Sequence, residues 1–182
     1  MRFHYRHIAY FLLLFSVSSI VAQEVFICVW RNPERTMTRL FPDAKEYRTV
    51  NRKIKPDQRE VIEKRLGALL LPGQQDNFQH FEMLGGKGEL IGYVIASTQK
   101  GQYGAIEFVM GLDKEKKISG IYIQRARERD QEFKKKEFLD SFTGKSLEAI
   151  GNNLQSYEKI SAAAVTVAQG IRKELITLEE TN

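Results

Sequence analysis

The chain has 182 residues, of which 42% are hydrophobic and 28% charged, and its formal net charge is +5. This length and composition are typical of one globular domain with a real core, and they exclude a disordered chain. The densest basic run, residues 134–136, lies between Glu132 and Glu137, so we interpret it as a solvated helix face and expect no nucleic-acid binding.

The N-terminus has the outline of a secretory signal. Arg2 and Arg6 precede an apolar run over residues 8–21, and Ala22 closes that run with a small side chain. The run is shorter than the roughly 20 residues that a membrane-spanning helix needs. We therefore predict that residues 1–22 are a signal peptide cleaved near Ala22. Its removal lowers the net charge to +3, because it contains two arginines and no acidic residue.

An uncleaved N-terminal anchor is the alternative, because the apolar residues 25–30 can lengthen the span and attach the protein to the membrane. In either case residues 23–182 form the folded domain, in the periplasm or on the outer face of the cytoplasmic membrane. The single cysteine, Cys28, cannot form an internal disulfide. Within an apolar run we interpret it as a buried small hydrophobic residue; pairing with another chain or a reactive thiol are the alternatives.

Hydrophobic periodicity and turn residues predict the remaining elements in chain order. These are a strand-like piece at 25–30, helices at 32–41 and from 56 to about 71, strands at 78–84, 89–98, 103–112 and 117–124, short helices near 138–142 and 146–150, and a long terminal helix after Ser161. Consecutive strands joined by tight turns indicate an antiparallel meander. The predicted fold is a single α+β domain in which helices pack against one curved sheet, with the first two helices covering it.

The terminal helix begins with a feature that suits an anion. Ser161 is a favourable N-cap, and residues 162–164 are all alanine, so no large side chain crowds the helix end. Such an end offers unpaired backbone N–H groups and the positive pole of the helix dipole. The sequence therefore predicts a phosphate site there, and the phosphate could belong to a nucleotide cofactor.

This turn resembles the flavin-attachment motif of the FMN-binding domain family, which includes the G subunit of Rnf-type electron transport complexes and the C subunit of the sodium-translocating NADH:quinone reductase. The family motif is Ser/Thr-Gly-Ala-Thr-x-Ser/Thr, and the threonine after Gly-Ala carries FMN through a phosphoester bond. The matching positions are Ser161, Ala163 and Thr166. The departures are Ala162 in place of glycine and Ala164 in place of the acceptor threonine, and Val165 stands at the variable position.

The resemblance extends over roughly residues 85–178. The blocks that carry it are 103–113 and 117–122, which look like the family's central hairpin, and 138–145, which resembles its Phe-Leu-x-x-Phe-x-Gly-Lys stretch. Between them the family often has Glu-Thr-Pro-Gly near the flavin, and of that sequence only Glu128 is present here.

The resemblance implies an FMN site formed by Ser161, the alanines that follow it, Val165, Thr166 and Glu128. In addition, Tyr103 or Tyr122 could stack on the flavin. Because Ala164 cannot form the phosphoester, we expect the flavin to be bound without a covalent bond. Attachment at Thr166 is the other option, although two residues along a helix correspond to a rotation of about 200°.

Stand-alone enzymatic chemistry has little support in the sequence. The histidines at positions 4 and 7 lie in the predicted signal, and His80 lies in a predicted strand without a nucleophile elbow or a metal-ligand cluster, so we interpret it as structural. A flavin carrier needs only cofactor binding from its protein. We therefore expect an extracytoplasmic FMN-binding electron-transfer protein, whose partner is a redox protein or a membrane electron-transport complex. The alternative is a flavin-free relative that acts as a binding or assembly subunit of a redox or transport complex.

Overall fold

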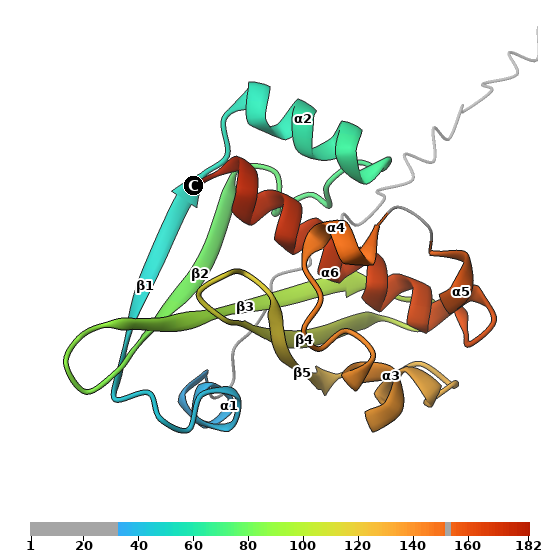
Figure 1. Ribbon diagram of the computed structural model, residues 1–182. Helices are drawn as coiled ribbons and strands as arrows, with labels where there is room; N and C mark the ends of the chain where they lie inside the picture. Colours follow the sequence, from blue (N-terminus) through green and yellow to red (C-terminus); the bar gives the residue numbers. More distant parts are fainter. Residues whose placement is uncertain (1–32, 152–153) are drawn as a thin grey trace, which may run out of the picture.

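A computed structural model of the protein describes residues 33–151 and 154–182 (Figure 1). The predicted signal peptide, the strand-like piece at 25–30 and Cys28 lie outside these residues. The helices are α1 (Pro33–Leu40), α2 (Pro56–Leu66), α3 (Lys136–Asp140), α4 (Leu147–Ile150), α5 (Gln155–Glu158) and α6 (Ala162–Glu180), with a 3-10 turn η1 (Glu132–Lys134) before α3. The strands are β1 (Glu46–Lys53), β2 (Asn77–Leu84), β3 (Leu90–Lys100), β4 (Ala105–Leu112) and β5 (Ile118–Arg125).

The five strands form one sheet in the order β1-β2-β3-β4-β5, and every neighbouring pair is antiparallel. This arrangement confirms the predicted α+β meander in a single domain, and the sheet does not close into a barrel. Four of the strands were expected within a few residues of their observed bounds. The strand predicted from residue 103 begins at Ala105, because Gly101 and Gly104 form the turn that joins β3 to β4, with a 2.8 Å hydrogen bond from Gly101 N to Gly104 O.

Strand β1 was not predicted, because its sequence has no hydrophobic alternation and nearly all of its residues are exposed. It forms as an edge strand because it pairs with β2 along its whole length, from Glu46 opposite Leu84 to Lys53 opposite Asn77. Polar side chains also join across the pair, since Gln79 Nε2 donates to Asn51 Oδ1 at 2.8 Å. Pairing with a neighbour, and not burial of an apolar face, therefore determines this strand.

Helix α2 is shorter than predicted. It ends at Leu66 because Gly67 adopts a left-handed conformation (φ 73°) and its N–H bonds to Glu63 O at 2.9 Å. The apolar residues that follow belong to the connection to β2, in which Leu70 is buried and Leu69 is 79% exposed.

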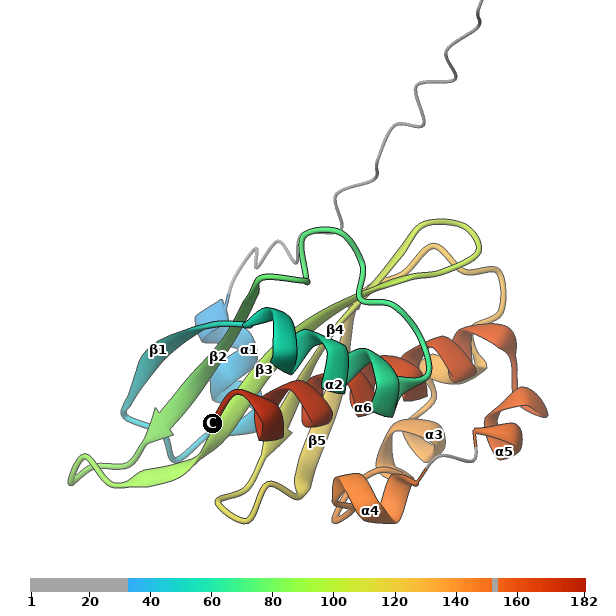
Figure 2. The same ribbon diagram turned by 90° about the horizontal axis from the view of Figure 1, so that it is seen from above.

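Helix α6 lies across one face of the sheet and forms the centre of the main core. Its buried residues Val167, Ala168 and Ile171 join a cluster with Ile95, Phe108 and Met110 of the central strands. Gly170 allows close contact, because a Cβ atom there would lie 2.6 Å from Gln99 Cγ and 3.0 Å from Phe108 Cε1. Helix α2 lies beside α6 on the same side of the molecule (Figure 2).

The first two helices were expected from the sequence to cover the sheet together, and this expectation was wrong. Helix α1 packs on the opposite face of the sheet, where Met37 joins a second cluster with Phe81, Met83 and Val94. Helix α2 contacts α6 instead of lying directly on the strands. The two clusters lie on opposite faces of the sheet because alternate residues of a strand point in opposite directions. Met110 of β4, for example, points to the face on which α6 lies.

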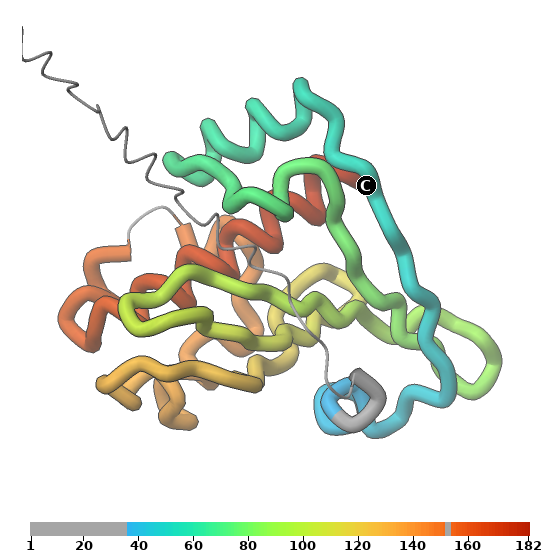
Figure 3. The backbone as a smooth tube through the Cα atoms, turned by 180° about the vertical axis from the view of Figure 1, so that it is seen from behind, coloured from blue at the N-terminus to red at the C-terminus, as the bar shows by residue number. Residues whose placement is uncertain are grey.

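The sheet is open along part of its length. Strands β2 and β3 pair only from Phe81 opposite Val94 to Leu84 opposite Leu90, near their hairpin. From Phe81 toward the start of β2 the two strands separate, and β1 and β2 turn away from β3, β4 and β5 (Figure 3). Helix α6 lies along one side of this opening, where Lys173, Glu174 and Thr177 line it.

Candidate functional site

The start of α6 is capped as the sequence predicted. Ser161 has an extended backbone (φ −175°, ψ 165°), and its Oγ accepts the N–H of Ala164 at 3.1 Å. Ala162 is exposed, whereas Ala163 and Ala164 are 5% and 0% exposed and belong to the main core. The position that corresponds to the family's flavin acceptor is therefore turned into the core.

Thr166 lies at the second turn of α6. Its Oγ1 donates to Ala162 O at 3.1 Å, one turn back along the helix, and the residue is half-buried. Val165 is also half-buried and packs against the main core. The Thr166 hydroxyl is thus directed to the helix backbone and not to the Ser161 turn.

The loop after β5 brings a carboxylate to this helix end. The Ser161 hydroxyl, by hydrogen bonding, and the backbone N–H of Glu132, 2.9 Å from Asp130 Oδ1, both hold the pKa of Asp130 below its usual value. Asp130 is consequently an anion at the place where the sequence predicted a phosphate. No local pattern indicates this contact, because 31 positions separate Asp130 from Ser161.

Glu128, two residues earlier, holds the turn between β3 and β4. Its side chain is buried (6% exposed), and Oε1 accepts the main-chain N–H of Tyr103 at 3.0 Å. A Cβ atom at Gly101 would lie 2.2 Å from the same oxygen, so the close approach requires glycine. The Tyr103 ring is 40% exposed, and the guanidinium carbon of Arg129 lies 4.7 Å from its centroid.

The structure thus brings together residues from three of the segments singled out in the sequence. Tyr103 bonds to Glu128, and Asp130 of the same loop lies near the Ser161 hydroxyl, with its Oδ2 buried and without a close hydrogen-bond partner among the described residues. The alanines at 163 and 164 and the hydroxyl of Thr166 point elsewhere. This group of residues offers the exposed ring of Tyr103 and the capped start of α6. The acidic side chain of Asp130, however, lies at that same helix start.

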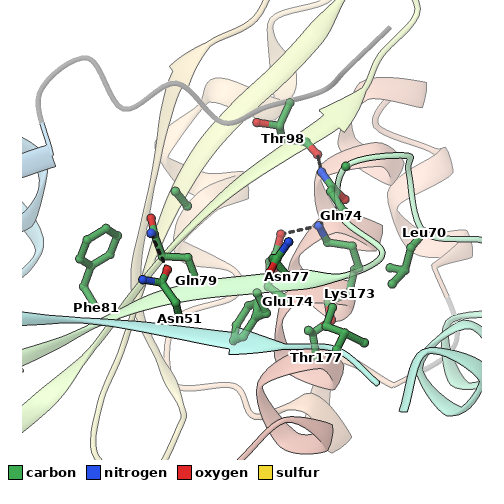
Figure 4. Close-up of a pocket in the computed structure, with 14 residues that line it drawn as sticks. Asn51, Leu70, Gln74, Asn77, Gln79, Phe81, Thr98, Lys173, Glu174 and Thr177 are labelled. Carbon is green, nitrogen blue, oxygen red and sulfur yellow. Dashed lines mark hydrogen bonds and ion pairs between the residues drawn. The ribbon is translucent and has the colours of Figure 1, made fainter. Parts of the chain in front are cut away.

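A second candidate site was not foreseen. It is a cavity of about 270 Å³ in the opening between β2 and β3, lined by those strands, β1, the loop before β2 and α6 (Figure 4). Its polar lining comprises Asn51, Gln74, Asn77, Gln79, Thr98, Lys173, Glu174 and Thr177, and its apolar lining includes Ile54, Leu70, Phe78, Phe81 and Ala96.

Buried charges form the α6 side of this cavity. Lys173 and Glu174 are 7% and 4% exposed, and Lys173 Nζ lies 2.6 Å from Glu174 Oε1. Lys173 Nζ also donates to Gln74 Oε1 at 2.7 Å, and Gln74 Nε2 in turn donates to the carbonyl of Thr98 at 2.7 Å. This chain of contacts connects α6 to the edge of β3 that is not paired with β2. Thr98 is 1% exposed. Its hydroxyl has no hydrogen-bond partner within the described part of the chain.

No sequence signal could have found this cavity. In a helix otherwise marked by Ile171 and Leu175, an adjacent Lys173 and Glu174 look like solvent-facing residues. They are buried because β1, β2 and the loop before β2, all far away in the chain, lie around this part of α6.

His80 stands between the cavity-lining residues Gln79 and Phe81 of β2 but is not itself part of the lining, and its surroundings are structural. It is 1% exposed, between the rings of Phe78 and Tyr93, and burial lowers the pKa of its imidazole. Over the described ranges, no three His, Cys, Asp or Glu side chains gather as a metal site would require, and no helix is long and apolar enough to cross a membrane. Comparison with models of known protein families finds no match, and comparison with curated proteins finds none either.

Proposed function

We propose that the protein is a flavin-free relative of the FMN-binding domains, acting outside the cytoplasm as a binding or assembly subunit of a membrane-associated redox or transport complex. The resemblance of residues 85–178 supports the setting, and the signal-like segment 1–22 supports the location. The choice against a flavin carrier rests on the start of α6.

The observation that carries the proposal is the Asp130 carboxylate at Ser161. The Ser161 hydroxyl and the Glu132 N–H both favour its charged form, so it is an anion at neutral pH. The phosphate of FMN is also an anion, and like charges at one helix end repel each other. Binding FMN here would therefore require Asp130 to move away or to take up a proton.

Ala164 supports the same conclusion. A threonine at this fully buried position would bring a hydroxyl into the apolar core, where an unpaired polar group is unfavourable. Restoring the family's residues with Ala162→Gly and Ala164→Thr is therefore expected to leave the protein without a well-fitted flavin site.

The deciding experiment is a visible absorption spectrum of the protein purified from its native compartment, followed by titration with FMN. We expect a colourless protein that does not take up FMN. Asp130→Asn removes the charge and keeps the shape, so it should raise the affinity for FMN or inorganic phosphate, whereas Glu132→Gln, the same charge change on an exposed neighbour, should not. A yellow wild-type protein would contradict the proposal.

The second candidate is the electron carrier with non-covalent FMN. The observation that favours it is the grouping of Tyr103, Glu128 and Ser161, three residues expected at a flavin, on neighbouring loops around one helix end. Acid precipitation separates its two forms. Flavin released into the supernatant would indicate non-covalent binding, and flavin retained in the pellet would indicate attachment, with Thr166 as the residue to examine by peptide mass.

A further inference from the structure

We propose that the opening between β2 and β3 is a binding site for a small, uncharged, hydroxyl-rich molecule of about monosaccharide size. The site is separate from the Ser161 turn, because twelve residues of helix, roughly 18 Å, lie between Ser161 and Lys173. The inference therefore does not rest on the proposed function.

The first support is the interrupted ladder of main-chain hydrogen bonds. Continuing the register of Phe81 opposite Val94 by two residues at a time would pair Gln79 with Ala96, and then Asn77 with Thr98. All four of these residues line the cavity, and neither pair is formed. The carbonyl of Thr98 bonds to the Gln74 side chain instead. Strand edges inside a domain present N–H and C=O groups that need partners, and a ligand with several donors and acceptors could provide them.

The second support is the charge balance of the wall. Lys173 and Glu174 neutralise each other at 2.6 Å, and the other polar side chains around the cavity are amides and hydroxyls. Amides donate and accept, and so do hydroxyls, whereas a net charge on the ligand would meet no unpaired opposite charge. The wall therefore matches a neutral ligand whose groups also both donate and accept, which is the chemistry of a polyhydroxylated molecule.

The third support is the Thr98 hydroxyl. Thr98 lines the cavity, but its hydroxyl oxygen is turned away from the open space and is buried without a hydrogen-bond partner among the described residues, and a buried polar group in that state is unusual. Rotation about the Cα–Cβ bond of Thr98 would turn this oxygen toward the cavity, where a ligand hydroxyl could complete its bonding. The volume of about 270 Å³ is close to the lower end of small-molecule sites and suits a single sugar ring, with Ile54, Leu70 and Phe78 as apolar contacts.

The test uses four single-ring sugar probes, measured by ligand-observed NMR and by titration with the full-length protein. Glucose and N-acetylglucosamine are uncharged, glucosamine is a cation and glucuronate is an anion. We expect the two uncharged probes to bind and the two charged ones to bind at least several-fold more weakly. Failure of both uncharged probes to bind, or tighter binding of either charged probe, would overturn the proposal.

Variants then locate the binding. Thr98→Val keeps the shape of the side chain and removes the hydroxyl, so it should weaken the uncharged probes by about three- to tenfold. Thr143→Val makes the same change at an exposed residue after α3 and should leave binding unchanged. Ala96→Leu, which adds bulk to the cavity wall, should abolish binding. Thermal melting of each variant checks its fold, and unchanged affinity in folded Thr98→Val and Ala96→Leu would show that the probes bind elsewhere.

Discussion

The carboxylate of Glu128 accepts the main-chain N–H of Tyr103 at 3.0 Å and so fastens the β3-β4 turn to the loop after β5. The two residues are 25 positions apart, and Glu128 is almost completely buried. This contact positions the loop in which Asp130 lies near Ser161. Removing the contact should lower the free energy of unfolding by a measurable amount.

Glu128→Ala should lower the free energy of unfolding by about 1–3 kcal/mol, because the Tyr103 N–H loses its acceptor in a buried setting. Glu128→Gln keeps an acceptor oxygen at the same reach and should have the smaller effect. Urea denaturation of both variants makes the comparison. Equal losses in the two variants would mean that the carboxylate's charge, and not the hydrogen bond, stabilises the turn.

Gly101→Ala should be destabilising by about 1–3 kcal/mol, since its Cβ would lie 2.2 Å from the Glu128 carboxylate oxygen and 2.9 Å from Gly104 O. Gly86→Ala is the matched control, because the nearest atom to a Cβ there, apart from its chain neighbours, is 3.9 Å away. Combining Gly101→Ala with Glu128→Ala should cost less than the sum of the single changes, because both act on one contact. Strict additivity in thermal or urea unfolding would contradict this relationship.

Gly170→Ala tests the contact of α6 with the sheet. In an exposed helix such a change is favourable by about 1 kcal/mol, but here the new Cβ would lie 2.6 Å from Gln99 Cγ and 3.0 Å from Phe108. We expect a net destabilisation of about 1–2 kcal/mol. Gln169→Ala, at the exposed neighbouring position, should change stability by no more than a few tenths. A stabilised Gly170→Ala variant would mean that the helix can move away from β3.

Lys173→Met should be among the most destabilising single changes, at about 3–5 kcal/mol, because it leaves the buried Glu174 without its counter-charge and removes the bond to Gln74. Replacing both members, with Lys173→Met and Glu174→Leu together, should recover most of that loss. Chemical denaturation of the two single variants and the double variant forms the cycle. A double variant whose loss equals the sum of the two single losses would show that the pair is not coupled.

The stability of the protein should fall as the pH drops below 6.5. Burial lowers the pKa of His80 in the folded state, with the nearby charges of Arg52 and Lys116 acting in the same direction and Glu82 opposing them. The unfolded chain therefore binds a proton first, so stability is complete above pH 6.5 and declines as the pH falls from there to the lowered pKa. His80→Gln should remove this part of the pH dependence in denaturation measured between pH 5 and pH 8. An unchanged slope would assign it to other groups.

Local patterns predicted most of the fold. The apolar alternation of β2 to β5, the glycine turns between them and the three- and four-residue spacing in α6 each depend on neighbouring residues, so they can be recognised without knowledge of the tertiary structure. Strand β1 was missed because pairing with β2 determines it. The end of α2 was misplaced because the left-handed Gly67 stops the helix while apolar residues continue.

The sequence by itself determined the antiparallel meander, the capped terminal helix and the run of alanines at its start. Only the tertiary structure decided that Asp130 lies at Ser161, that Ala164 faces the core, and that Lys173 and Glu174 are buried beside an opening in the sheet. The physical reason is that a helix cap or a strand pattern is set by residues close in the chain. The charge at a helix end and the gap between two strands depend instead on where distant segments pack.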